Sequence, residues 1–351
     1  MQVITHHEKE KWNEIVKSFS NWDVYYLCEY AESFMLHGDG TPYLFYFKDG
    51  SSRLCYVVLL NDIAEISAYK GHIKTGVYFD ITTPYGYGGP IVEGEFKKRN
   101  QAKFLTELSQ YCRENNIITQ FLRFHPLFQN QVYMDSICEI FPIKDTITMD
   151  TISSDTIQKN LHSKNQNMIR KAKKVGVEIK QDNGERLDDF IRIYESTMDN
   201  NKASEYYYFS SDYYEFLRKE MSENVSFFYA CKEEEIIGAS IFLYNDQYMH
   251  YHLSGTQKEF REFASMNLLL YEAALWAEKK GIKQFHLGGG VSATDSLFKF
   301  KKQFNKNGYK HFYIGRNIFD EQVYNHLLQI RKMIDPKFNI NNDKLIQYRK
   351  D

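Results

Sequence analysis

The sequence predicts a mixed α/β protein built from two domains of similar architecture. Its 351 residues are more than a single hydrophobic core usually takes. Apolar residues make up 43% of the chain and aromatic residues 16%, which excludes a disordered protein and favours large, well-filled cores. A hairpin, a strand, a loop, a helix and a strand are expected in this order in each half. We infer from this order that one α/β domain has been duplicated.

The first half carries clear signals for this series. Two aromatic and β-branched runs flank Asp49-Gly50, which predicts a β-hairpin. The loop that follows the third strand, TPYGYGGP at 83–90, is dense in turn-forming residues. The expected elements are a helix at 9–18, strands at 42–47, 53–60 and 77–83, a helix at 96–114 and a strand at 117–124.

The second half repeats the series, with Ser254 lying 170 residues after Pro84. Its expected elements are a helix beginning at Ser154 and ending before Gly176, strands at 225–231, 236–243, 247–254 and 284–287, a helix at 265–280 and a tail helix at 319–334. We therefore expect domains at residues 1–150 and 151–316, with the C-terminal helix of residues 317–351 packing back on the first. The polar residues 339–351 are expected to be loosely ordered.

Charge and cysteine content narrow the functional classes. The formal net charge is −2, so any contact with a nucleic acid must come from a local basic patch. The five cysteines are scattered and form no CxxC pair, which is typical of a reducing compartment and predicts no metal site. No apolar run reaches about 18 residues and no signal peptide is present, so we expect a cytoplasmic protein without a membrane span.

One segment is strongly basic. Between residues 164 and 174 there is no acidic residue, although the whole chain has 46 acidic and 44 basic residues. The segment is expected to be helical and carries five cations, Lys164, Arg170, Lys171, Lys173 and Lys174. This pattern favours a helix that binds a polyanion, and the alternative is a solvated helix face.

A second distinctive segment, 286–304, joins a glycine turn to a cation between aromatic residues. Gly288, Gly289 and Gly290 permit close approach of the backbone to a ligand. Lys301 lies between Phe300 and Phe304, and such a cation suits a phosphate or the oxyanion that forms from a carbonyl. The alternative is an ordinary strand-to-helix turn, because no phosphate-loop fingerprint is present.

Taken in order, seven short motifs resemble the FemABX-like branch of the GNAT superfamily. They are PYGYGGP (84–90), RFHP (123–126), NMIRKAKKVGV (167–177), ASEYYYF (203–209), HYHLSGT (250–256), ASMNLLLYEAALWAEKKG (264–281), and HLGGG (286–290) followed by FKKQF (300–304). The resemblance implies two GNAT-type domains with a cleft between them. It also implies substrate contacts at the RFHP residues Arg123 and His125.

The resemblance also implies a function, because members of this branch aminoacylate cell-wall precursors from aminoacyl-tRNA. It implies an N-acyltransferase without bound cofactor or metal, whose partners are aminoacyl-tRNA and a UDP-linked or lipid-linked peptidoglycan precursor, with peripheral contact to a membrane. One alternative is an acyl-CoA-dependent N-acetyltransferase acting on an amino sugar or polysaccharide precursor. CoA-using relatives carry glycines where this chain has Ala264 and Met266, which disfavours CoA. The other alternative is a non-catalytic tRNA- or glycan-binding module.

Further candidates come from the strands and loops. Strict alternation along 247–254 would place Tyr248, His250, His252 and Ser254 on one face, where His252 could accept a proton. A structural histidine is the alternative. The remaining substrate-binding candidates are Tyr85, Gly86, Tyr87, Gly88 and Gly89 on the first glycine-rich loop, Tyr206 and Tyr207 for a sugar or the terminal adenosine, and Asn267 near a helix start. The alternative for the loop residues is a packed turn. Tyr206 and Tyr207 could instead fill a domain interface, and Asn267 could only satisfy the first turn of its helix.

Overall fold

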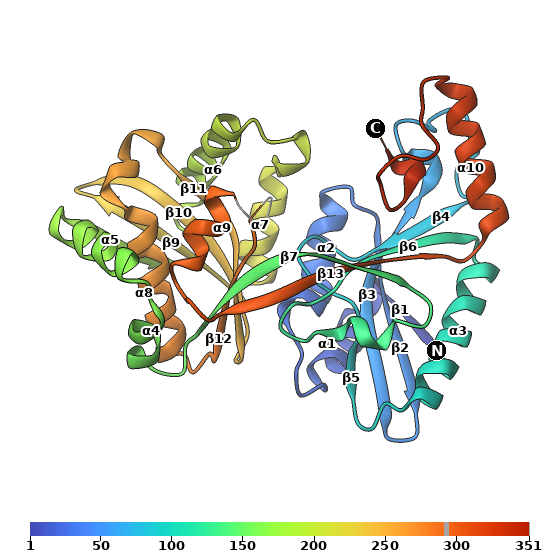
Figure 1. The fold of residues 1–351 in the computed structure, drawn as a ribbon, viewed down its shortest axis with the longest axis horizontal. Coiled ribbons are helices and arrows are strands. Elements are labelled where there is room, and N and C mark those ends of the chain that lie inside the picture. The colour runs from blue at the N-terminus through green and yellow to red at the C-terminus, as the bar shows by residue number, and fades with distance from the viewer. Residues whose placement is uncertain (291–294, 351) are drawn as a thin grey trace. The chain divides into compact units, whose positions relative to one another are not determined.

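The structure is a computed structural model that describes residues 1–290 and 295–350 (Figure 1). The chain divides into two compact units, one of Met1–Ile143 with Phe312–Asp351 and one of Lys144–His311. Each unit contains a mixed sheet covered by helices, which confirms the predicted α/β class. Among the described residues, no helix is long and apolar enough to cross a membrane.

The first unit contains a sheet in the order β1-β2-β3-β4-β6-β13, with β5 paired to β3. Its strands are β1 (Gln2–Thr5), β2 (Thr41–Asp49), β3 (Ser52–Asp62), β4 (Phe79–Thr82), β5 (Ile91–Glu93) and β6 (Ile117–Arg123), and it shares β7 (Glu139–Asp150) and β13 (Tyr309–Ile318) with the second unit. Its helices are α1 (Lys9–Lys17), α2 (Cys28–Leu36), α3 (Lys98–Glu114) and α10 (Glu321–Ile334). Within this unit β4 and β6 run parallel, and β13 pairs antiparallel with β6.

The hairpin and the amphipathic helix predicted in the first half are both confirmed. β2 and β3 pair in register from Thr41 with Leu60 to Asp49 with Ser52, around the Asp49-Gly50 turn. The apolar face of α3 packs on this sheet through Phe104 and Leu108, which are fully buried. Burial of such side chains from water supplies most of the stabilisation of the unit.

The second unit contains a sheet in the order β7-β12-β11-β10-β9-β8. Its further strands are β8 (Val177–Asp182), β9 (Val225–Lys232), β10 (Glu235–Tyr244), β11 (Tyr248–Thr256) and β12 (Gln284–Gly288). Its helices are α4 (Ser154–Asn160), α5 (Ser163–Lys174), α6 (Leu187–Asn201), α7 (Ser211–Glu220), α8 (Ser265–Lys279) and α9 (Ser296–Lys302). β11 and β12 are parallel neighbours joined through α8, so the chain makes one βαβ crossover here.

The core of the second unit forms between this sheet and α8. Leu269, Ala273 and Ala277 of α8 are fully buried against sheet residues that include Phe242 and Phe285. α8 also packs against α5. Because both the sheet and α5 cover it, α8 is apolar on most of its surface. α8 ends at Lys279, and Gly281 just after it adopts the left-handed conformation, as predicted for a glycine that terminates a helix.

The single helix predicted after Ser154 is wrong, because the structure has two helices there. Leu161 and His162 adopt extended backbone conformations between α4 and α5. A residue distant in the sequence stabilises this break, because the His162 N–H donates to the Gln303 carbonyl oxygen at 2.9 Å. Ser153 rather than Ser154 caps α4, because its hydroxyl oxygen accepts from the Thr156 N–H at 3.1 Å.

The prediction of a loosely ordered C-terminus is also wrong. Tyr348 is fully buried, and its hydroxyl donates to Asp80 Oδ2 at 2.9 Å and lies 2.7 Å from Thr119 Oγ1. Arg349 Nε donates to the same carboxylate oxygen at 2.7 Å. These bonds hold the end of the chain on β4 and β6, next to the apolar face of α10.

Candidate functional site

The glycine turn at the end of β12 is shaped by side chains that pack against it. Gly288 has a φ of +72°, which disfavours any residue with a Cβ. A Cβ on Gly289 would lie 3.0 Å from the Asp145 carbonyl oxygen and 3.4 Å from Lys144 Cε. A Cβ on Gly290 would lie within 2.6 Å of Asp295 Cγ. A side chain at position 289 would therefore meet the Asp145 carbonyl oxygen, and one at position 290 would displace the Asp295 carboxylate.

Lys301 reaches this turn from α9. Asp295 caps this seven-residue helix by accepting from the Phe298 N–H at 2.7 Å, which orients its first turn. The Lys301 side chain is only 7% exposed. Its Nζ donates to the Gly289 carbonyl oxygen at 2.8 Å and lies 5.4 Å from the centre of the Tyr251 ring.

The surroundings of Lys301 change its protonation. The pKa of Lys301 is lowered to about 7, mainly by burial and to a smaller extent by the positive charge of Lys144, while the Asp295 carboxylate opposes both effects. Ammonium and neutral amine are therefore both populated near neutral pH. A lysine in this state can stabilise negative charge or exchange a proton, which an exposed lysine does poorly.

The aromatic ring that faces the Lys301 ammonium is Tyr251. Phe300 and Phe304, which flank Lys301 in the sequence, instead pack against each other with ring centroids 5.3 Å apart. The neighbouring Lys302 is exposed and lies over the Tyr309 ring. The FKxxF motif therefore predicts an unusual lysine, but the ring it meets comes from β11.

The alternation predicted along β11 is wrong beyond Tyr251. Tyr251 pairs with Phe242 and Leu253 pairs with Ile241, so His252 is an extra residue that bulges from the strand. The Tyr251 hydroxyl consequently reaches Ser254 and donates to its Oγ at 2.6 Å. Strict two-residue alternation would put these side chains on opposite faces.

His252 forms a hydrogen bond with α7. Its Nε2 lies 2.8 Å from the Tyr213 hydroxyl. Burial and, to a smaller extent, His250 lower the pKa of His252 to about 3. An imidazole with this pKa is neutral and weakly basic at physiological pH, which favours the structural interpretation of His252.

Asn267 ties three helices of the second unit together. Its Nδ2 donates to Asn165 Oδ1 at 2.8 Å, and Asn165 Nδ2 donates to the Gln303 carbonyl oxygen at 3.3 Å. Asn267 lies in α8, Asn165 in α5 and Gln303 just after α9. The start of the basic helix α5 is thus connected to the end of the helix that carries Lys301.

The predicted basic segment is an exposed helical face. α5 buries Asn165, Ile169 and Ala172, while all five predicted cations are exposed. Lys173 is paired, since its Nζ lies 2.8 Å from Glu272 Oε1 and faces the Tyr271 ring. A groove of about 410 Å³ adjoins this helix, with Trp276 and Ile179 in its apolar lining and Lys173 and Lys279 among its cations.

Tyr206 and Tyr207 lie elsewhere on the second unit, in a short 3₁₀ turn after α6. Their side chains are 36% and 37% exposed, and their rings meet edge to face. The Tyr207 carbonyl oxygen accepts from the Tyr194 hydroxyl at 3.0 Å, which anchors the turn to α6. About a third of each side chain is thus exposed to solvent.

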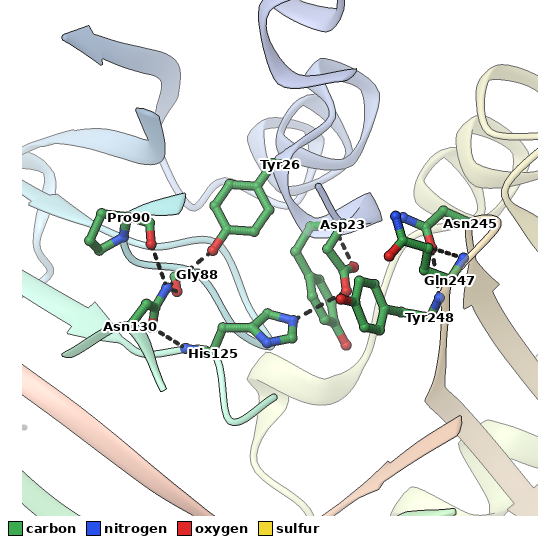
Figure 2. Close-up of polar contacts among 10 residues, drawn as sticks. Asp23, Tyr26, Gly88, Pro90, His125, Asn130, Asn245, Gln247 and Tyr248 are labelled. Atoms are coloured by element: carbon green, nitrogen blue, oxygen red, sulfur yellow. Dashed lines mark hydrogen bonds and ion pairs between the residues drawn. The ribbon is translucent and has the colours of Figure 1, made fainter. Parts of the chain in front are cut away.

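In the first unit, Asn130 joins the two predicted loop motifs (Figure 2). Its Nδ2 donates to the carbonyl oxygens of Gly88 and Pro90, both at 2.9 Å. Its Oδ1 accepts from the His125 N–H at 2.9 Å. PYGYGGP and RFHP are therefore fixed to each other by one buried amide, which no pattern in the sequence indicated.

The substrate-binding candidates on these two motifs contact other residues of the first unit. His125 Nε2 lies 3.2 Å from Asp23 Oδ2, and both side chains are fully buried. Arg123 donates to the Thr83 carbonyl oxygen at 3.3 Å. The half-buried Tyr87 lies edge to face with the His125 ring, and burial raises the pKa of its hydroxyl.

Glycines shape the rest of the PYGYGGP loop. Gly86 and Gly89 have φ values of +86° and +78°. Gly88 is buried, and its N–H donates to the Arg123 carbonyl oxygen at 2.8 Å. The half-buried Tyr85 is held through its carbonyl oxygen, which accepts from the Tyr30 hydroxyl at 2.7 Å.

Comparisons with known proteins agree with this architecture. Residues 159–302 match the family described as Acetyltransferase (GNAT) domain. No curated protein matches the chain in sequence. Similar solved structures include FemX, with 13% identity over 93% of this chain and 99% of that one and a TM-score of 0.65. L-PGS from Bacillus licheniformis has 12% identity over 93% and 97%, with a TM-score of 0.55.

A tandem GNAT protein from the clavulanic acid biosynthesis pathway is also similar. It has 8% identity over 91% of this chain and 98% of that one, with a TM-score of 0.51. At these identities the likeness concerns the fold. The predicted fold of two GNAT-like domains is confirmed.

Proposed function

Because residues 159–302 match a GNAT acetyltransferase domain and the fold is similar to that of FemX, we propose that the chain is a FemABX-like acyltransferase that transfers an amino acid from aminoacyl-tRNA to an amine of a peptidoglycan precursor. The reaction would take place in the cytoplasm, on a UDP-linked or lipid-linked acceptor. The observation that carries the proposal is the buried Lys301, held at a glycine turn with a pKa of about 7.

The chemistry assigns Lys301 a definite task. The neutral acceptor amine attacks the ester carbonyl carbon, a C–N bond forms, and the C–O bond to the tRNA ribose breaks. The amine loses a proton and the ribose oxygen gains one, which yields an amide and a free hydroxyl. The Lys301 ammonium stabilises the negative charge that develops on the carbonyl oxygen, in a site from which water is largely excluded.

Two further features support an RNA-bound donor. The face of α5 offers Lys164, Arg170, Lys171 and Lys174 to phosphates, and all four are exposed. Asn165 and Asn267 link this helix to the segment that carries Lys301, so phosphate binding and acyl transfer can be coordinated. Tyr206 and Tyr207 offer exposed rings on which a base or sugar can stack.

The GNAT match itself favours a second candidate, an acyl-CoA-dependent N-acetyltransferase acting on an amino sugar. The entry to α8, where such enzymes bind pyrophosphate, argues against it. Ala264 occupies a left-handed conformation with φ of +55°. Met266 lies against Gly238, where its Sδ would be 2.9 Å from an added Cβ. Both side chains occupy positions at which glycine would let a pyrophosphate approach the backbone.

Donor profiling tests the proposal. The purified protein is incubated with charged tRNAs or with acyl-CoAs and a UDP-linked muropeptide, and products are identified by mass spectrometry. We expect the acceptor to gain the mass of one amino acid only with charged tRNA. Acetylated product formed from acetyl-CoA would establish the second candidate. No product with any donor, together with retained tRNA binding, would instead establish a binding module.

Charge reversal on α5 tests the donor separately. The Arg170→Glu/Lys171→Glu variant should bind tRNA more weakly, with a flatter salt dependence, since each phosphate contact contributes a log–log slope of roughly −0.7 to −0.9. The Lys337→Glu/Lys344→Glu variant makes the same change in net charge at exposed positions of the first unit. Equal tRNA binding by the two variants would show that the basic face of α5 is a solvated surface that does not bind tRNA.

A further inference from the structure

We infer that Lys144 is a positioning residue that sets the orientation and the charge state of Lys301. The inference rests on the proposed function of Lys301 and adds a second lysine that no sequence motif singled out. Lys144 lies in β7, and Lys301 lies in α9, far away in the sequence. Both ammonium groups reach the same glycine turn.

The geometry gives the two lysines adjacent partners. Lys144 Nζ donates to the Gly290 carbonyl oxygen, and Lys301 Nζ donates to the Gly289 carbonyl oxygen. The aliphatic stem of Lys144 runs along Gly289, where Cε and Cδ lie 3.4 and 3.5 Å from the position of an added Cβ. Lys144 therefore holds the Gly290 carbonyl group and packs along Gly289, directly beside the carbonyl that Lys301 binds.

The charges around Lys301 come from three elements. Lys144 on β7 is positive, Asp295 at the start of α9 is negative, and Tyr251 on β11 presents a neutral ring. Asp295 also accepts the capping bond from Phe298, so one shared carboxylate faces two ammonium groups. Within α9, Lys299 and Lys302 are exposed to solvent.

This arrangement makes Lys144 a regulator of the proton on Lys301. With both lysines protonated, the cluster carries one excess positive charge, which favours loss of the proton from the more buried Lys301. Removing the charge of Lys144 should let Lys301 keep its proton to a higher pH. Because Lys144 is half-exposed and partly screened by water, we expect a shift of about one pH unit.

The test follows Lys301 directly by NMR. Full-length protein labelled with ¹³Cε-lysine is titrated from pH 5.5 to 9.5, and the Lys301 signal is assigned by its loss in Lys301→Arg. The expected midpoint is near pH 7 in the native protein and in Lys144→Arg. It should lie about one unit higher in Lys144→Met and Lys144→Gln. The same displacement is expected for the inflection in the pH dependence of kcat/KM.

The outcomes separate this inference from the proposed function. An unchanged midpoint in Lys144→Met and Lys144→Gln, or an equal shift in Lys144→Arg, would overturn the role of Lys144. Full activity of Lys301→Ala with aminoacyl-tRNA would overturn the role proposed for Lys301 in the reaction but leave the NMR titration standing, whereas no aminoacyl transfer by the native protein would overturn the proposed function. Lys144→Gln provides the neutral variant if Lys144→Met does not fold.

Discussion

Replacing Lys301 by methionine is expected to remove most of the activity while stabilising the fold at low pH. Methionine fills the space of the lysine stem but carries no charge. In the folded protein the pKa of Lys301 is about 7, against an ordinary value of 10.5. The unfolded chain therefore binds the proton more tightly than the native protein, so protonation of this lysine favours unfolding.

The sign and size follow from these two pKa values. Between pH 7 and 10.5 the unfolded state holds more protons at this lysine, so the stability of the native protein rises with pH. The cost of Lys301 is about 5 kcal/mol at pH 6 and about 2 kcal/mol at pH 9. The lost hydrogen bond to Gly289 offsets part of the gain at every pH. The advantage of the methionine variant should therefore shrink by about 3 kcal/mol from pH 6 to pH 9.

Urea unfolding of the native protein, Lys301→Met and Lys302→Met at pH 6, 7, 8 and 9 measures this difference. Lys302 is the matched control because it is exposed and lies over the Tyr309 ring. Stability curves of the native protein and Lys301→Met that stay parallel across this range would refute the reasoning. In turnover assays Lys301→Met should lose about 10²-fold or more and Lys302→Met almost nothing. Near-normal turnover of Lys301→Met would remove Lys301 from the site.

Three further substitutions have defined outcomes. Asn130→Ala should lower the free energy of unfolding by about 3 kcal/mol in urea titrations, because it leaves several buried groups without partners. The control Asn115→Ala, at an exposed position, should change it by under about 0.5 kcal/mol. Gly290→Ala should displace the Asp295 carboxylate from its cap, costing about 1 kcal/mol and lowering turnover; unchanged values in both assays would contradict this packing. Tyr348→Phe should lower the free energy of unfolding by about 1–2 kcal/mol, and an unchanged urea midpoint would mean that its bond to a buried carboxylate adds nothing.

Elements whose signal is local could be predicted from the sequence. The hairpin of β2 and β3 follows from two strand-forming runs around Asp49-Gly50. α8 follows from its apolar content and from Gly281 at its end. In each case the residues that determine the element lie within it or next to it, so one pass along the chain is sufficient.

Features that depend on distant residues could not be predicted. The break between α4 and α5 requires the Gln303 carbonyl oxygen to accept from the His162 N–H. The bulge at His252 breaks the alternation by one residue, and nothing in the strand marks it. Tyr348 orders the C-terminus through a carboxylate 268 residues away.

In the candidate site, too, features with a local signal could be predicted and features that depend on distant residues could not. Lys301 stands out in the sequence because a lysine between phenylalanines after a glycine turn is unusual. Its low pKa, however, arises from burial and from Lys144, and its ring partner is Tyr251. Asn130 was missed because a single asparagine in an irregular segment carries no periodic signal.

The route of the chain through the first unit has a consequence for synthesis on the ribosome. Residues 144–311 form the second unit as one continuous stretch, whereas the first unit needs residues from 312 onward. Until these emerge, β6 lacks its neighbour β13, and Asp80 lacks Tyr348 and Arg349. The N-terminal unit is thus begun first and completed last. Meanwhile the nascent chain exposes one edge of β6, and an unpaired strand edge favours pairing with other chains.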